Sequence, residues 1–239
     1  DNRTMPDALE PFSPATQQWF RNAFGTPTAA QEGAWESISK GENALIIAPT
    51  GSGKTLAAFL WALDALYRDK STEPDQRELT TSTQARKNGD ARETQKTKKQ
   101  RAGGTRILYV SPLKALGADV ERNLRAPLAG IAHTAKESGR TPPDITVGIR
   151  SGDTPARERR QLISNPPDIL LTTPESLYLM LTSAARSTLT GVTTVIVDEV
   201  HALAGTKRGA HLAVSLERLD QLVERPVQRY APRSEEHTS

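Results

Sequence analysis

Short apolar segments alternate along the chain with longer, helix-like segments. Each apolar segment is rich in Ile, Val and Leu, and a helix-like segment follows it. Continuous apolar strands separated by helices predict an α/β fold, in which a mostly parallel sheet is covered by helices on both faces. Ligands bind to such sheets at the carboxyl ends of the strands. The predicted strands are residues 44–48, 107–110, 145–149, 169–171 and 195–197.

Capping residues mark where the helices begin and end. A hydroxyl residue followed by proline favours a helix start, because the hydroxyl caps the first turn and proline lacks only an N–H that would be unpaired there. Glycine just past a helix favours its end. The predicted starts are Ser13-Pro14, Thr154-Pro155 and Thr173-Pro174; the second helix covers 28–40, Gly25 and Gly41 close the first two helices, and the last helix covers 209–224.

Residues 71–103 differ in composition from the rest of the chain. They carry eight Lys or Arg and five Asp or Glu. The resulting excess of +3 equals the formal net charge of the whole chain. Their only sizeable apolar residue is Leu79. Such a segment buries too little apolar surface to offset the cost of ordering, so we predict a disordered insertion. An arm that loosely holds nucleic-acid phosphates is the alternative.

Composition excludes several other classes of protein. The chain has no cysteine, which excludes disulfides and thiolate metal sites and agrees with a reducing cytoplasm. No apolar run approaches the roughly 20 residues that span a bilayer, so we expect a soluble, cytoplasmic protein without a membrane partner.

The two ends of the chain indicate that its natural boundaries lie elsewhere. The chain begins with Asp1 rather than methionine, so we expect it to start inside a longer reading frame. Residues 233–239, RSEEHTS, match the translation of a common sequencing adapter. We interpret them as an artefact and take residues 1–232 as the domain.

A phosphate-binding loop is the first chemical motif. The stretch ALIIAPTGSGKTLAAF, residues 44–59, has an apolar strand before the loop and a helix after it. Ala48 stands where the general pattern has glycine, but Gly53-Lys54-Thr55 is intact. The glycines let backbone N–H groups point at phosphate oxygens, Lys54 should reach the β- and γ-phosphates, and Thr55 should bind Mg²⁺. The predicted ATP-binding residues here are Thr50, Gly51, Ser52, Gly53, Lys54 and Thr55.

An acid pair at the end of a strand is the second motif. In TTVIVDEVHAL, residues 193–203, Asp198 and Glu199 directly follow apolar residues. Two carboxylates in such a place are costly unless a cation offsets them. We predict that Asp198 holds Mg²⁺ through water, beside the loop strand. Glu199 would orient or deprotonate the water that attacks the γ-phosphate.

Together, APTGSGKT and DEVH resemble a superfamily 2 helicase. DEVHALAGTKRGAHLAVSLERL, residues 198–219, with PFSPATQQWF resembles the large helicase-related (Lhr) family of bacterial ATP-dependent DNA helicases. The resemblance implies a RecA-like domain of the P-loop NTPase fold, the first of two. The enzyme would translocate 3′ to 5′ along single-stranded DNA, in DNA repair.

The resemblance also assigns roles to further residues. Gln31, in TPTAAQ, would recognise adenine, and His201 would relay the nucleotide state to the DNA side. Lys207 and Arg208 fit either a solvated pair at a helix end or a phosphate contact. Three loops would grip the nucleic-acid backbone through Pro112, Leu113 and Lys114, through Gly152, and through Thr173, Pro174 and Glu175.

The resemblance implies further helicase parts besides these motifs. No Ser-Ala-Thr segment follows the last helix, and a second RecA-like domain with its γ-phosphate arginines would have to lie elsewhere. We therefore expect weak ATP binding and slow hydrolysis from this chain alone.

RNA or a DNA–RNA hybrid remains an alternative substrate. A non-helicase P-loop ATPase or a non-catalytic nucleic-acid-binding module are alternative functions.

Overall fold

The fold is built on a six-stranded sheet in which every pair of neighbouring strands is parallel. This computed structural model describes residues 7–72, 104–112 and 121–234. The strand order is β1-β6-β5-β2-β4-β3. The strands are β1 (Ala44–Ala48), β2 (Ile107–Val110), β3 (Val147–Arg150), β4 (Ile169–Thr172), β5 (Thr194–Val197) and β6 (Gln228–Ser234).

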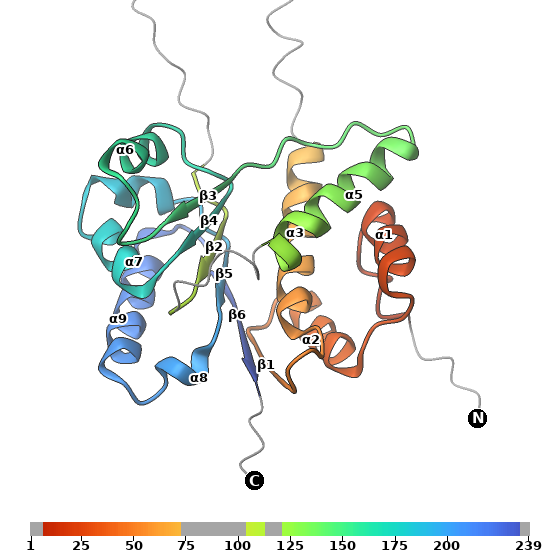
Figure 1. Ribbon diagram of the computed structural model, residues 1–239, viewed down its shortest axis with the longest axis horizontal. Coiled ribbons are helices and arrows are strands. Elements are labelled where there is room, and N and C mark those ends of the chain that lie inside the picture. Colours follow the sequence, from red (N-terminus) through yellow and green to blue (C-terminus); the bar gives the residue numbers. More distant parts are fainter. Residues whose placement is uncertain (1–6, 73–103, 113–120, 235–239) are drawn as a thin grey trace, which may run out of the picture.

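Helices cover both faces of the sheet, as the alternating pattern predicts (Figure 1). One side carries α1 (Pro14–Phe24), α2 (Ala29–Ser39), α3 (Lys54–Thr72) and α5 (Ala126–Glu137). The other carries α6 (Ala156–Ser164), α7 (Pro174–Leu181) and α9 (Lys207–Leu222). Shorter elements are the π-helix η2 (Glu121–Arg125), the 3₁₀-helix η3 (Ala184–Leu189) and the single turn α8 (Val200–Leu203).

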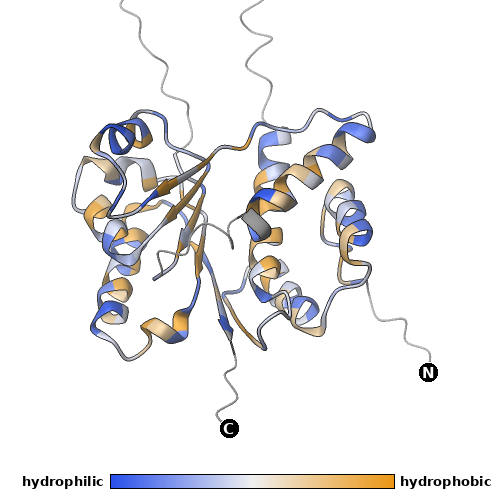
Figure 2. Ribbon diagram, in the orientation of Figure 1, coloured by the Kyte–Doolittle hydropathy of each residue, from blue (hydrophilic) through white to orange (hydrophobic). Residues whose placement is uncertain are grey.

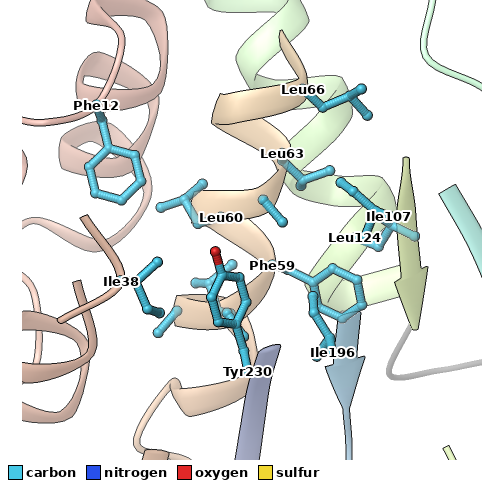
Figure 3. Close-up of a cluster of buried hydrophobic side chains, with 14 of the residues drawn as sticks. Phe12, Ile38, Phe59, Leu60, Leu63, Leu66, Ile107, Leu124, Ile196 and Tyr230 are labelled. Carbon is cyan, nitrogen blue, oxygen red and sulfur yellow. The ribbon is translucent and has the colours of Figure 1, made fainter. Parts of the chain in front are cut away.

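Apolar side chains form one core on each side of the sheet, and the strands appear mainly as hydrophobic ribbons in Figure 2. The larger core surrounds α3, where Phe59, Leu60 and Leu63 are almost fully buried (Figure 3). Trp35 of α2 also donates from Nε1 to Ala57 O, 3.0 Å away. The helix that follows the phosphate loop is therefore fixed against the sheet and against α2.

A buried carboxylate ties the N-terminal helix to α3. Asp64 is fully buried, accepts a 2.7 Å hydrogen bond from Thr16 Oγ1 and pairs with Arg68 at 3.0 Å. Its carboxylate also accepts from the backbone N–H of Ser13, the residue that caps α1. The buried carboxylate oxygens of Asp64 therefore have hydrogen-bond and ion-pair partners, which offset the cost of their burial.

The predicted capping residues are confirmed at two helices and wrong at one. Ser13 and Thr173 cap α1 and α7. Thr28, predicted as the first residue of the second helix, is the cap of α2. Before α6, however, Pro155 occupies the cap position, and Thr154 Oγ1 instead accepts from Ser151 N–H at 2.8 Å. The Thr154 hydroxyl therefore closes the preceding turn and is not free for the helix.

Several predicted boundaries also shift. β3 begins two residues later than predicted and ends at Arg150, and α9 begins at Lys207 because Thr206 caps it. α3 extends through Thr72, so it includes the first two residues of the predicted insertion. Residues 73–103 lie outside the described residues.

The prediction that the Asp198 strand lies beside the loop strand is wrong. β6, which the apolar pattern did not predict, pairs with β1 on one side and β5 on the other. It contains Arg233 and Ser234, the first two residues of the predicted artefact, while 235–239 lie outside the described residues. The origin of 233–239 stays a hypothesis.

Candidate nucleotide and nucleic-acid sites at one sheet edge

The phosphate loop curls around one carbonyl group. Pro49 O accepts from Ser52 N–H at 3.3 Å and from Lys54 Nζ at 3.2 Å. Gly51 and Gly53 have φ angles of 84° and 78°, which glycine adopts at little cost. Lys54 begins α3 and is only 8% exposed, with Thr55 beside it. The loop thus has the backbone shape that the sequence predicts.

The N-terminus of α2 holds this loop from outside. Thr28 Oγ1 donates to Ser52 O at 2.9 Å, and Gln31 Nε2 approaches Gly53 O at 3.4 Å. Gln31 Oε1 accepts from Thr28 N–H at 3.0 Å, which completes a capping box. The Thr-x-x-Gln spacing in TPTAAQ carries the signal for this box. In the structure Gln31 contacts the loop, and its contact with adenine stays a prediction.

Asp198 is held at the end of β5 by two hydrogen bonds. Its Oδ2 accepts from the hydroxyl of Tyr109, and its Oδ1 accepts from Glu199 N–H at 2.9 Å. The residue is 8% exposed. Tyr109 is a contact that the sequence analysis missed, since β2 is distant in sequence from Asp198 and only strand pairing brings the two together.

Glu199 adopts a left-handed backbone conformation. With φ 52° and ψ 37°, it is the only non-glycine residue with positive φ in the described ranges. Such a conformation costs about 1–2 kcal/mol for an L-residue and is often found at functional sites. Its Oε2 lies 3.0 Å from His201 Nε2. His201 Nδ1 is buried and has no hydrogen-bond partner among the described residues.

The phosphate loop and the acid pair lie at the same edge of the sheet. Ile196, Tyr230 and Ala44 are aligned across β5, β6 and β1, so Asp198 is level with Ile46. Two strand spacings, about 10 Å, separate those strands. The α3 helix connects the two sites. It begins at Lys54, and the ring of its Phe59 packs 4.9 Å from the ring of Tyr109. The Tyr109 hydroxyl in turn donates to Asp198.

The residues at this edge suit a nucleotide with its metal ion. Ser52 Oγ is buried and has no hydrogen-bond partner in the described part of the chain, so it can donate to a phosphate oxygen. Within the same ranges, no three His, Asp or Glu side chains form a metal site by themselves. Proteins usually bind Mg²⁺ through one or two carboxylates, waters and substrate phosphates, and Asp198 is one carboxylate at this edge.

The predicted nucleic-acid loops occupy the other half of the same edge. Pro112 follows β2, Gly152 follows β3 and Thr173 follows β4, and these three strands are neighbours. Leu113 and Lys114 lie outside the described residues. A Cβ added to Gly152 would meet nothing within 4 Å, and its φ is not positive. Neither packing nor conformation therefore requires glycine here, but an approaching backbone would.

Two arginines sit beside the loop after β3. Arg150 is 8% exposed, and its Nη1 has no hydrogen-bond partner among the described residues. Desolvation, and then the charge of Arg159, lower the pKa of Arg150. Arg159 donates to Thr154 O at 2.7 Å and to Gly152 O at 2.8 Å. Arg159 lies outside the loops predicted from the sequence, because only its contacts within the folded loop make it notable.

Comparisons with known proteins found similar sequences and folds. The family model "DEAD/DEAH box helicase" matches residues 28–232. The Lhr helicase/probable uracil glycosylase of Mycolicibacterium smegmatis is 59% identical over 93% of the chain. The Lhr helicase/uracil glycosylase of Escherichia coli is 57% identical over 94% of the chain. The chain spans 13% of the length of each of these relatives.

Solved structures show the same fold. The Mycobacterium smegmatis helicase Lhr bound to ssDNA and AMP-PNP superimposes with a TM-score of 0.79 and 55% identity, covering 97% of this chain and 26% of that one. The DEAD-box helicase Mss116 bound to ssRNA and AMP-PNP, at 16% identity, covers 97% of this chain and 41% of that one with a TM-score of 0.68. In the described part of this chain, no helix is long and apolar enough to cross a membrane.

Proposed function

Because the chain belongs to the DEAD/DEAH box helicase family, we propose that it is the first motor domain of an ATP-dependent DNA helicase. One observation carries the proposal: a single sheet edge bears the phosphate loop and acid pair on β1 and β5, and the three predicted nucleic-acid loops on β2, β3 and β4. ATP and a nucleic-acid strand can therefore bind side by side on one rigid sheet.

The nucleotide half of the edge binds and activates ATP. Backbone N–H groups of residues 50–55 and the ammonium of Lys54 hold the phosphates, and the N-terminus of α3 adds its positive dipole end. Thr55 and Asp198, the latter through water, would hold Mg²⁺, which would offset the phosphate charge. Glu199 orients the attacking water and accepts its proton. His201, which lies in α8 and pairs with Glu199, relays the nucleotide state towards the DNA-binding side.

The other half of the sheet edge binds single-stranded DNA by contacting the DNA backbone. The loop at Pro112 and the two residues after it, the loop at Gly152, and the start of α7 at Thr173 to Glu175 contact the strand, through the backbone N–H groups of their non-proline residues and the Thr173 hydroxyl. Such contacts position a strand without reading its sequence. The Lhr structure with ssDNA and AMP-PNP supports this assignment by its similarity. Translocation from 3′ to 5′ and a role in DNA repair belong to the same proposal, as does cytoplasmic location.

Strand separation requires more than this domain. A second RecA-like domain would supply the arginines that contact the γ-phosphate, and such an arginine can raise the rate about 10³- to 10⁵-fold. We therefore expect weak ATP binding and slow hydrolysis from the 239-residue chain. Robust strand separation by residues 1–232 alone would contradict this.

Paired variants of the complete gene product test the function. Lys54→Ala should abolish ATP binding, whereas Glu199→Gln should keep binding and stop turnover. ATP hydrolysis should rise when single-stranded DNA is added; equal rates with and without it would favour a non-helicase ATPase. Parallel titrations with RNA of the same sequence decide the substrate, because backbone contacts alone do not select the sugar.

A further inference from the structure

One arginine at the start of α9 joins two of the predicted nucleic-acid loops. We propose that Arg208 is a positioning residue that clamps the loop after β2 to the loop after β4, so that both grip the strand in a fixed register. The inference rests on the proposed function. It concerns how the grip is built, a role that neither the motifs nor the comparisons assign.

The clamp has two arms. Arg208 Nε donates to Glu175 Oε1 at 2.7 Å, and its Nη2 donates to Pro112 O at 3.2 Å. Pro112 follows β2, and Glu175 lies in the first turn of α7, directly after β4. The planar guanidinium presents several donors in a rigid fork, so one side chain can hold both partners at once. Lysine, a point charge, cannot reproduce that geometry.

The charges agree with a clamp in which both partners are ionised. The hydrogen bond from Arg208 is the main cause that lowers the pKa of Glu175, and Glu175 in turn raises the pKa of Arg208. Both side chains are about half exposed, at 50% and 53%. Exposed pairs contribute little to folding stability, so the pair serves mainly to set the position of the loops. It also neutralises a carboxylate that would otherwise repel phosphate.

The clamp is attached rigidly to the acid pair. Glu199 stands at the N-cap position of α8 and His201 lies within α8, which is followed after a short turn by α9. At that junction, a Cβ on Gly209 would stand 2.1 Å from Leu203 O. Thr206 fixes the turn further, accepting from Gly209 N–H at 3.1 Å and donating to Leu203 O at 2.7 Å. A displacement of α8 therefore moves Arg208, together with its two contacts at Pro112 and Glu175.

A direct phosphate contact by Arg208 is the competing explanation, and the two make opposite predictions for Glu175→Gln. If Arg208 is a clamp, this variant loosens the α7 arm and weakens DNA binding. If Arg208 binds phosphate, the variant frees the guanidinium and removes a repelling charge, so binding tightens. The sign of the change therefore separates the two explanations.

The experiment measures the affinity of the 239-residue chain for fluorescein-labelled oligothymidine at low salt. Arg208→Ala should weaken binding about fivefold and Glu175→Gln about threefold, with Arg208→Lys in between, since each arm is an exposed contact of at most about 1 kcal/mol. Lys207→Ala is the matched control: it removes the same charge from the same helix turn and should cost at most about twofold. Affinity for a fluorescent ATP analogue should stay unchanged in all four variants.

Three results would overturn the clamp. Tighter binding by Glu175→Gln would assign Arg208 to a phosphate. Equal losses for Lys207→Ala and Arg208→Ala would reduce its role to general charge. If Arg208→Ala binds DNA with the same affinity as the parent chain, Arg208 has no role in DNA binding. Absence of DNA binding by the parent chain would overturn the nucleic-acid half of the proposed function together with the clamp.

Discussion

Replacement of Tyr109 by phenylalanine tests how Asp198 is held. The Tyr109 hydroxyl donates to Asp198 Oδ2, and both residues are buried, at 3% and 8% exposure. A hydrogen bond to a charged group contributes about 1.5–3 kcal/mol to stability, because its loss leaves the charge less solvated. Since 1 kcal/mol shifts the Tm by about 2–4 °C in a domain of 150–250 residues, Tyr109→Phe should lower the Tm by about 3–12 °C.

Tyr230→Phe is the matched control. Tyr230 is 1% exposed and donates to a neutral acceptor, Gln228 Oε1, at 2.8 Å. Burial raises the pKa of Tyr230, so its hydroxyl remains a donor at neutral pH. Loss of a neutral hydrogen bond costs about 1 kcal/mol, or about 2–4 °C. Urea unfolding of both variants gives the free energies, and nucleotide affinity should fall only in Tyr109→Phe. Equal destabilisation by the two substitutions would refute the reasoning.

Three further predictions concern the loop, the acid pair and the clamp. Gly53→Ala should lower the Tm more than Gly51→Ala: both positions have positive φ, but only at Gly53 would the new Cβ stand 2.4 Å from Gln31 Nε2. In a background that also carries Gln31→Ala, the two glycine variants should have equal losses of Tm. An unchanged difference in Tm between them would contradict the predicted clash. Glu199→Gly should be more stable than Glu199→Ala by about 1 kcal/mol in urea unfolding, because only alanine keeps the left-handed strain; the reverse order would argue against strain. Arg208 lowers the pKa of Glu175 below its ordinary 4.5, so the pair contributes stability above that pH and loses it as the pH falls through the folded pKa. Arg208→Ala should therefore flatten the dependence of Tm on pH in this acid range, and parallel curves would speak against the ion pair.

The parts of the fold and site that depend on local sequence could be predicted. The phosphate loop is specified by two glycines whose positive φ the chain requires, and by the strand and helix that flank it. Ser13, Thr28 and Thr173 cap their helices through contacts only three residues long. Five of the six strands are apolar runs in the sequence; β2, β4 and β5 are buried on both faces, whereas β1 and β3 keep exposed apolar side chains at Leu45, Ile47 and Ile149.

β6 could not be predicted, because its neighbours create the environment that makes it a strand. QRYAPRS contains one large apolar side chain, Tyr230, and a proline, which usually argues against an inner strand. The register with β5 ends at Tyr230, so Pro232 faces β1 only. Arg229 is compensated by an ion pair with Asp220. Because β6 was not predicted, β1 and β5 were expected to be neighbouring strands, whereas β6 lies between them.

The contacts of Arg208 were equally inaccessible from sequence. Its two partners, Glu175 and Pro112, lie 33 and 96 positions away, and only the packing of α7 and α9 on one face of the sheet brings them together. The sequence left Arg208 open between a solvated charge and a phosphate contact. The structure shows a third arrangement, in which its charge is directed at a carboxylate and a carbonyl of the protein.

The central claim is that Lys54 and Asp198 meet around one magnesium–nucleotide complex. It is tested most directly by the affinity of the chain for a fluorescent ATP analogue, measured with Mg²⁺ and with EDTA in the parent and in Asp198→Asn. We predict that Mg²⁺ tightens binding in the parent and that Asp198→Asn removes most of this gain while keeping the metal-free affinity. An undiminished Mg²⁺ effect in Asp198→Asn would contradict the account, because the acid pair would then lie outside the nucleotide site.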